Sequence, residues 1–350
     1  MLSNNLNKKR LEEFEQFLIK VNERTEYQFN LRDRYDPPVD DPALDEDVEY
    51  FGFNILQDDR MRYIIENIVT VDSLSMDNKI GNTIISHFYG ARGIHEIVTG
   101  IKDYKKAHVD FERIDAGDIE YLNNIKTQID ISKKAKKKFY GTTELHTSLQ
   151  TAARNFCRNK YGEPDREASL SDIIEWIASW KSDGTFERIK NDAITLKDMY
   201  GILTSKPGIG EYYGYHCATS NSVNPYLPFQ HDEEFCAPGP GARSSLDYIF
   251  DSYTGKRKYG EMVVWLRDNQ STLLNHITIH QFFHNYEINN KKVFKDEQNN
   301  LKVYGLEVGL CQFGVYCWLK ENPHLISKRK IARQVDDTSC DTVSNLSKYF

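Results

Sequence analysis

Apolar residues recur along most of this 350-residue chain at the three-to-four-residue spacing of an amphipathic α-helix. Near the N-terminus, for example, Leu11, Phe14 and Leu18 fall on one helical face. Strand-like alternation of apolar and polar residues is scarce, and residues 290–304 are the one reasonable hairpin candidate. The sequence therefore predicts a mainly α fold with at most a small β-hairpin. Further helices are expected around residues 58–70, 76–90, 92–100, 145–160, 170–182, 187–204, 211–220, 243–253, 259–284 and 305–320.

No clear linker divides the chain. We expect one helical domain over residues 1–325, with two helical lobes and a cleft between them. The sequence becomes polar and basic after Pro323, so residues 326–350 are expected to form a tail. No apolar stretch is long enough to cross a bilayer, and the N-terminus lacks a secretory signal. A cytoplasmic protein with reduced cysteines is therefore expected, since its six cysteines include no CxxC pair.

The net charge of −7 argues against a uniformly basic coat for nucleic acid, but it allows a local basic groove. Two clusters of lysine and arginine lie at residues 133–138 and 328–333. Lys136 and Lys137 of the first cluster are candidate DNA contacts. The alternatives are a solvated face for the first cluster and a flexible tail for the second.

A glycine-containing bend between two predicted helices is the most informative local motif. Its sequence, KPGIG at residues 206–210, permits a tight turn, and Ile209 can fill the space between the helices. Backbone N–H groups at the start of the second helix can then hold a phosphate oxygen. Lys206, Gly208, Ile209 and Gly210 are therefore candidate DNA contacts. An ordinary helix–turn–helix with a glycine-capped turn would show the same pattern.

An acidic turn, HDEEF at residues 231–235, follows the second helix, and Asp232 lies 24 residues after Gly208. This order resembles the helix–hairpin–helix DNA glycosylases, in which such a hairpin precedes the aspartate that works at the sugar. The resemblance implies a helix–hairpin–helix DNA glycosylase-like fold with Asp232, and Glu234 beside it, as catalytic residues. Tyr212 stands where bifunctional members carry a lyase lysine, so no Schiff-base chemistry is implied. The alternative is an exposed acidic loop.

A carboxylate is suited to that chemistry, because cleavage of an N-glycosidic bond builds positive charge on the sugar. The base must first leave the stack and enter a pocket of aromatic and apolar side chains. Tyr212, Tyr213 and Phe235 are candidates for this pocket, although aromatic residues at such spacing also build cores.

Several short motifs, in order along the chain, resemble one more specific family. They are PPVDDPAL at 37–44, DDRMRYII at 58–65, APGPGAR at 237–243 and GLEVGLCQFGVY at 305–316. They are similar to the helical domain of 5-hydroxymethyluracil DNA kinases and to the α-glutamyl/putrescinyl-thymine pyrophosphorylase group. Those proteins act in thymine hypermodification, and the resemblance covers roughly residues 30–320.

This resemblance implies that Gly239, Gly241 and the following helix N-terminus hold an anion, either a DNA phosphate or a pyrophosphoryl group on the base. Arg243 would add a bidentate contact. The alternative is a rigid turn with a solvated arginine. Gln312 and Val315 depart from the family, which usually has an acidic residue and a lysine there. The chain has no GxxxxGK[ST] phosphate-binding loop, so it is not expected to be the kinase itself.

Three histidines, His276, His280 and His284, recur every four residues. Three collinear imidazoles cannot all reach one tetrahedral ion, so no metal site is expected there, and no cofactor is expected.

Three hypotheses follow for function. The first is a monofunctional DNA glycosylase that flips out and excises a hypermodified, 5-hydroxymethyl-derived pyrimidine, with anti-phage defence as its setting. The second is a DNA-base transferase that joins an amine or amino acid to an activated 5-hydroxymethyl pyrimidine. The third is a non-enzymatic DNA-binding module. The expected partner is DNA with modified bases of the phage type, and a monomer is expected.

Overall fold

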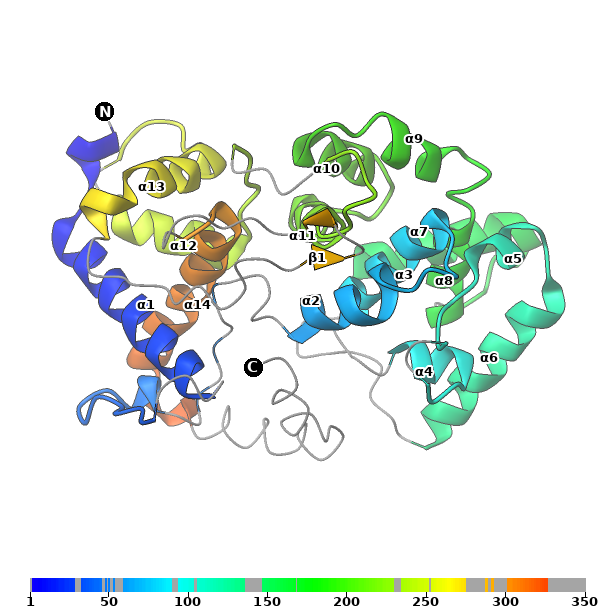
Figure 1. Cartoon of the computed structure of the whole chain (residues 1–350), viewed down its shortest axis with the longest axis horizontal. Helices are drawn as coiled ribbons and strands as arrows, with labels where there is room; N and C mark the ends of the chain where they lie inside the picture. The colour runs from blue at the N-terminus through cyan, green and yellow to red at the C-terminus, as the bar shows by residue number, and fades with distance from the viewer. Residues whose placement is uncertain are drawn as a thin grey trace. The chain divides into compact units, whose positions relative to one another are not determined.

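The computed structural model of the chain is mainly helical (Figure 1). It describes residues 2–28, 33–45, 48, 50, 53, 59–89, 94–103, 106–135, 147–167, 169–229, 234–251, 253–274, 287–288, 291–292 and 301–326. The chain forms two compact units. Unit 1 comprises Met1–Asp58, Glu233–Phe282 and Asp296–Phe350, and unit 2 comprises Asp59–Asp232 and Phe283–Lys295.

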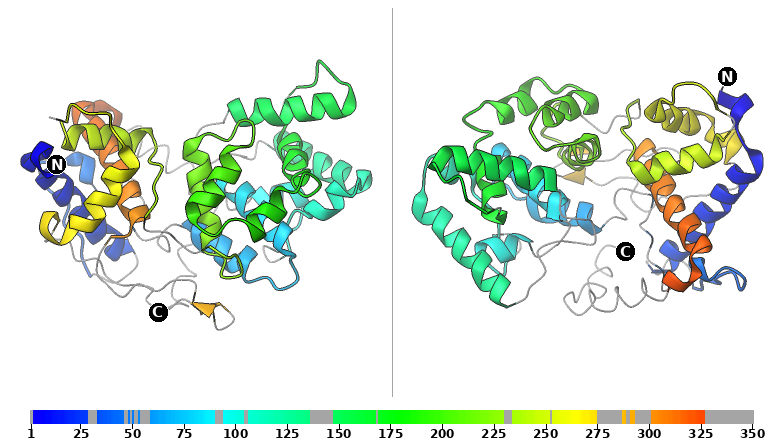
Figure 2. Two further views of the ribbon diagram at one scale, coloured as in Figure 1. Left: turned by 90° about the horizontal axis from the view of Figure 1, so that it is seen from above. Right: turned by 180° about the vertical axis from the view of Figure 1, so that it is seen from behind.

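Unit 1 combines the N-terminal helix with three helices from the C-terminal part of the chain (Figure 2). Its elements are η1 (Leu2–Asn5), α1 (Lys8–Gln28), η2 (Pro42–Leu44), α12 (Pro240–Ile249), α13 (Tyr259–Leu273), α14 (Val303–Glu321) and η5 (Pro323–Leu325). The core is aromatic: the ring centroids of Phe14 and Phe17 lie 5.2 and 5.6 Å from that of Phe313. All three side chains are almost completely buried, so helices distant in sequence share one apolar cluster.

Small residues allow α12 and α14 to pack closely in unit 1. A Cβ atom on Gly241 would lie 3.0 Å from Sγ of Cys311, and one on Gly314 would lie 3.1 Å from the carbonyl oxygen of Gly241. The APGPGAR motif therefore contributes a close helix contact, and larger side chains at these glycines would push the two helices apart.

Unit 2 holds the remaining helices. They are α2 (Asp59–Ile64) with a continuing π-helical turn (Ile65–Val69), α3 (Met76–Tyr89), α4 (Ile94–Thr99), α5 (Phe111–Asp115), α6 (Ile119–Lys134), α7 (Thr147–Tyr161), α8 (Leu170–Ala178), α9 (Thr185–Asn191), α10 (Leu196–Thr204) and α11 (Glu211–Ser222). Within this unit α7 packs on α8, α10 on α11, and α11 on α3. Gly208 of the predicted bend lies against Ser148 and Ala152 of α7, and residues 214–222 of α11 are buried.

The predicted mainly α class is confirmed. The described strands are β1 (Glu287–Ile288) and β2 (Lys291–Lys292), which pair antiparallel with Glu287 opposite Lys292. Strand β2 lies within the predicted 290–304 segment and β1 precedes it, and residues 293–300 are outside the described residues. None of the helices searched in the described part of the chain is long and apolar enough to cross a membrane.

Some predicted boundaries were wrong. The segment predicted as one helix over 187–204 is two helices, because Thr195 and Asp198 form a capping box that starts α10 after a break. Helix α6 was not predicted. The division into one domain and a tail at residue 326 stays a prediction, since residues 327–350 lie outside the described residues.

Candidate nucleic-acid interface

The bend at residues 206–210 joins α10 to α11 in unit 2. Helix α11 begins directly after Gly210, whose backbone is extended and which gives the helix no side-chain cap. Ile209 is 5% exposed, as a residue that fills the space between two helices must be. A Cβ atom on Gly214 would lie 2.4 Å from Cγ2 of Thr204, so α10 and α11 approach closely just beyond the bend. The bend is thus a tight, glycine-dependent helical hairpin.

Gly208 needs to be glycine for two reasons. Its φ of +81° lies in the left-handed region, which side chains other than glycine rarely adopt. A Cβ atom there would also lie 2.6 Å from the carbonyl oxygen of Ser148 and 2.9 Å from Cβ of Ala152. The Ser148 hydroxyl also donates a hydrogen bond of 3.2 Å to the carbonyl oxygen of Gly208. Helix α7 therefore supports the bend from one side.

The Lys206 side chain is held inside the protein. Its ammonium lies 2.7 Å from a carboxylate oxygen of Asp183 and 5.6 Å from the ring centroid of Trp180. Burial by itself raises the pKa of Asp183, but hydrogen bonds from Lys206 and Thr185 outweigh burial and leave this pKa below its usual value. The contact of Lys206 with DNA stays a prediction, and its ammonium would have to leave Asp183 to make it.

The aromatic residues predicted for a base pocket lie at the start of α11. Tyr212 and Tyr213 are both half-buried, and their ring centroids are 5.1 Å apart. The Tyr212 ring also lies 4.3 Å from that of His216, and the Tyr213 ring lies 6.0 Å from that of Phe88. Both tyrosines therefore belong to an aromatic cluster beside the bend, and their role in a base pocket stays a prediction.

Helix α11 carries a buried polar cluster that sequence reasoning missed. Nδ1 of His87 lies 3.0 Å from the hydroxyl oxygen of Ser220, and the His87 ring stacks on that of His216 at 5.5 Å. Burial, with a smaller effect of the Arg60 charge, lowers the pKa of His216 to about 3, so this imidazole is neutral at pH 7. Thr219 satisfies its hydroxyl by donating to the carbonyl oxygen of Tyr215. Only the fold brings these groups together, since α3 and α11 are more than 100 residues apart.

The predicted catalytic turn is described only in part. Asp232 lies outside the described residues. Glu234 belongs to unit 1, its side chain is 80% exposed, and it forms an ion pair of 3.2 Å with Arg267. Phe235 is half-buried. The catalytic roles of Asp232 and Glu234 and the pocket role of Phe235 therefore stay predictions.

The GPG turn of unit 1 leads into α12. The N–H of Gly239 donates a 3.0 Å hydrogen bond to a carboxyl oxygen of Glu307 on α14. Burial raises the pKa of Glu307 to about 7, although the Gly239 N–H lowers it in part. Glu307 thus occupies the position at Gly239 where an anion was predicted. It was missed because no spacing within the 305–316 motif distinguishes it from its neighbours.

The other predicted anion contacts have structural partners too. Gly241 packs against Cys311, as described above. Nε of Arg243 donates a 2.8 Å hydrogen bond to the carbonyl oxygen of Pro238, and its guanidinium lies 5.7 Å from the Tyr259 ring centroid. Anion binding by Gly241 and Arg243 stays a prediction. The remaining sequence candidates lie outside the described residues: Lys136, Lys137, His276, His280 and His284.

A comparison with protein-family models matches most of the chain. The family model described as the helical domain of a 5-hmdU DNA kinase matches residues 13–323, which include the bend, the acidic turn, the GPG turn and all of α14. No curated protein matches the chain. No solved structure matches it either, so the glycosylase-like fold stays a prediction.

This match corrects the first hypothesis for function. A kinase transfers a phosphoryl group to an acceptor and leaves the N-glycosidic bond of the base intact. The glycosylase reading, with excision of a base from DNA, is therefore wrong, and the transferase reading agrees better with the matched family.

Proposed function

Since the chain belongs to the 5-hmdU DNA kinase helical domain family, we propose that it is a DNA-base transferase that acts at the 5-hydroxymethyl group of a modified pyrimidine. The match over residues 13–323 carries this proposal, because it spans both units and all of the motifs on which the hypotheses depend. DNA that contains 5-hydroxymethyl pyrimidines is the proposed partner.

The reaction we propose keeps the base on the DNA. An amine or amino acid nitrogen bonds to the exocyclic carbon of the activated pyrimidine, the carbon–oxygen bond breaks, and pyrophosphate leaves with the bonding electrons. The nitrogen then loses a proton, and Asp232 is the proposed acceptor. Although the 5-substituent of a pyrimidine points into the major groove, we propose that the base is extruded for this chemistry and that Tyr212 and Tyr213 stack on it.

The helical hairpin supports binding of the DNA backbone. Its bend exposes Gly210 directly before the first turn of α11, where backbone N–H groups and the helix dipole favour a phosphate oxygen. Such a contact positions DNA without reading its sequence. It agrees with an enzyme that selects a modified base and not a base sequence.

The test is an analysis of reaction products. The protein is incubated with duplex DNA that contains 5-pyrophosphoryloxymethyluracil and an amine donor, and the digested nucleosides are identified by mass spectrometry. The control duplex contains thymine, and Asp232→Asn serves as the matched variant. We expect an amine-dependent, heavier nucleoside, no free base and no abasic site, with a large loss of product in Asp232→Asn.

Two results would contradict the proposal. Free modified base and alkali-sensitive abasic sites would show excision and not transfer. Salt-sensitive DNA binding without any modified nucleoside, under every donor tested, would show a DNA-binding module and remove the transferase role.

A further inference from the structure

We propose that the outward face of α7 is a second contact surface for the DNA backbone and continues from the hairpin bend. This inference rests on the proposed function, because it requires DNA at the bend. We call the surface the α7 face. Its residues are Ser148, Thr151, Asn155, Arg158 and Asn159.

The α7 face has the composition of a phosphate-binding surface. Helix α7 has no acidic residue, and of its three cations Arg158 lies on this face, whereas Arg154 lies outside the stripe and Lys160 pairs with Glu175. At 100° per residue the five members of the face fall within one stripe, and four are exposed while Arg158 is half-buried. Their hydroxyl, amide and guanidinium groups are the kinds that bind phosphate oxygens in protein–DNA complexes.

The α7 face begins at the bend. Ser148, its first member, donates its hydroxyl hydrogen bond to the carbonyl oxygen of Gly208. The same turn of α7 lies close enough to Gly208 to exclude a Cβ atom there. DNA whose backbone touches the bend would therefore also lie next to the first turn of α7.

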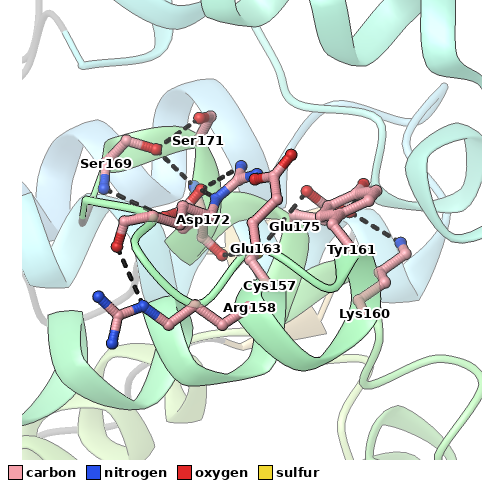
Figure 3. A network of polar contacts seen from close by, with 10 residues as sticks. Cys157, Arg158, Lys160, Tyr161, Glu163, Ser169, Ser171, Asp172 and Glu175 are labelled. Atoms are coloured by element: carbon pink, nitrogen blue, oxygen red, sulfur yellow. Dashed lines mark hydrogen bonds and ion pairs between the residues drawn. The ribbon is translucent and has the colours of Figure 1, made fainter.

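A network of partly buried ion pairs holds Arg166, which positions Arg158 at the other end of the face (Figure 3). Nε of Arg158 donates a 3.1 Å hydrogen bond to the carbonyl oxygen of Arg166. Arg166 is held in turn by Asp172, which accepts from its Nε at 3.1 Å and from its Nη2 at 2.8 Å and is itself 0% exposed. No described residue accepts a hydrogen bond from the two terminal nitrogens of Arg158, so they remain for a phosphate.

Two acidic side chains of this network, those of Glu163 and Glu175, are already paired. Glu163 follows α7 and forms a 2.7 Å ion pair with Arg166. Glu175 is 1% exposed and lies 2.7 Å from the ammonium of Lys160. The network thus neutralises these carboxylates within the protein, so they repel an approaching phosphate less.

The length of the face predicts how much DNA it contacts. Ser148 and Asn159 are separated by about 16 Å along the helix axis, at about 1.5 Å per residue. Successive phosphates of one DNA strand rise by about 3.4 Å along the duplex axis, but they are farther apart along the strand itself because it winds around the axis. We expect two or three of them to be in contact, because a straight helix follows a curved backbone only in part.

The test measures DNA affinity at several salt concentrations by fluorescence anisotropy. The probes are 20-base-pair duplexes with and without one 5-hydroxymethyluracil. Arg158→Ala removes the cation, and Thr151→Glu adds a negative charge at an exposed position outside the ion-pair network. We expect a loss of affinity of about fivefold for Arg158→Ala, equal for the two duplexes, and a decrease of about one in the slope of log affinity against log salt. Thr151→Glu is expected to lose about tenfold, and Arg158→Lys is expected to keep most of the affinity.

Matched controls come from other helices of unit 2. Arg188→Ala removes an exposed arginine of α9, and Thr127→Glu adds a charge at an exposed position of α6. The inference is overturned if the controls weaken binding as much as the α7 variants do. It is also overturned if Arg158→Ala and Thr151→Glu bind like the wild type, and in that case the proposed function survives. Absence of salt-sensitive DNA binding by the wild type would overturn both.

Discussion

Replacement of Gly208 by alanine tests whether the bend depends on its contact with α7. The substitution imposes two separate costs. An alanine at a φ of +81° carries the strain of the left-handed conformation, about 1–2 kcal/mol. Its Cβ atom would also lie 2.6 Å from a backbone oxygen, that of Ser148, which cannot move without shifting the helix. Overpacking of this kind typically costs about 1–3 kcal/mol.

Gly117 provides the matched control, since it belongs to the same unit and has a φ of +83°, but no atom lies within 4 Å of the position of its Cβ. The reduced entropy of the unfolded chain offsets part of the strain in both variants. We therefore expect Gly117→Ala to lower the free energy of unfolding by about 1 kcal/mol and Gly208→Ala to lower it by about 2–4 kcal/mol.

Urea denaturation followed by far-ultraviolet circular dichroism measures both changes. The difference between the two variants isolates the contact of the bend with α7. Equal losses for the two variants would refute the reasoning, because they would show that the backbone conformation alone is responsible and that α7 can move away from the bend freely.

Three further predictions concern buried and paired charges. The pKa of Glu307 is about 7 in the folded protein and about 4.5 in the unfolded chain. The free energy of unfolding of unit 1 therefore falls by about 3 kcal/mol as the pH rises from about 4.5 to 7, with no further loss above pH 7. Urea denaturation at pH 5 and 7.5 should therefore show a smaller pH dependence for Glu307→Gln than for the wild type, and an unchanged dependence would contradict the burial of its charge. His216, whose pKa is about 3 in the folded protein, gives the opposite pH dependence. Its contribution to the free energy of unfolding is complete above about pH 6.5 and is lost as the pH falls toward 3. Its imidazole should give no titration between pH 7 and 5 in nitrogen-15 nuclear magnetic resonance, and a midpoint near 6.5 would show that it is exposed. Lys206→Ala should lower the free energy of unfolding by about 1 kcal/mol, since it removes a partly screened ion pair with Asp183 and a contact with Trp180; no loss in thermal or urea denaturation would show that neither contact stabilises the protein.

The helical class could be predicted from the sequence because apolar periodicity is a local property. Capping signals are local too, and they were available both for the helix that was predicted as continuous over 187–204 and for α6, which was not predicted. Thr195 and Asp198 form the capping box that starts α10, and Asp118 caps α6, in which Leu122, Ile125 and Ile129 are buried at helical spacing. Closer attention to these residues would have divided 187–204 and found α6.

The site was harder to predict than the fold. The bend could be predicted because a Gly-X-Gly pattern has few structural uses. The contacts that its residues make with other helices could not be predicted. Lys206 pairs with Asp183 and Gly208 touches Ser148, and both partners come from other helices. Likewise, Glu307 reaches Gly239 from 68 residues away. Contacts of this kind depend on tertiary packing, which a single sequence without homologues does not reveal.

The polar composition of α11 has a consequence for how this protein tolerates mutation. Residues 214–222 are all buried, yet Thr219, Asn221 and Ser222 donate side-chain hydrogen bonds to carbonyl oxygens of the same helix, and the Ser220 hydroxyl lies 3.0 Å from Nδ1 of His87 in α3. In a deep mutational scan this stretch should behave like an interior segment and reject leucine or valine as firmly as it rejects lysine. Hydropathy alone would classify this stretch as a surface helix that tolerates substitution. Variant-effect scores based on hydropathy would therefore underestimate the damage caused by substitutions in it.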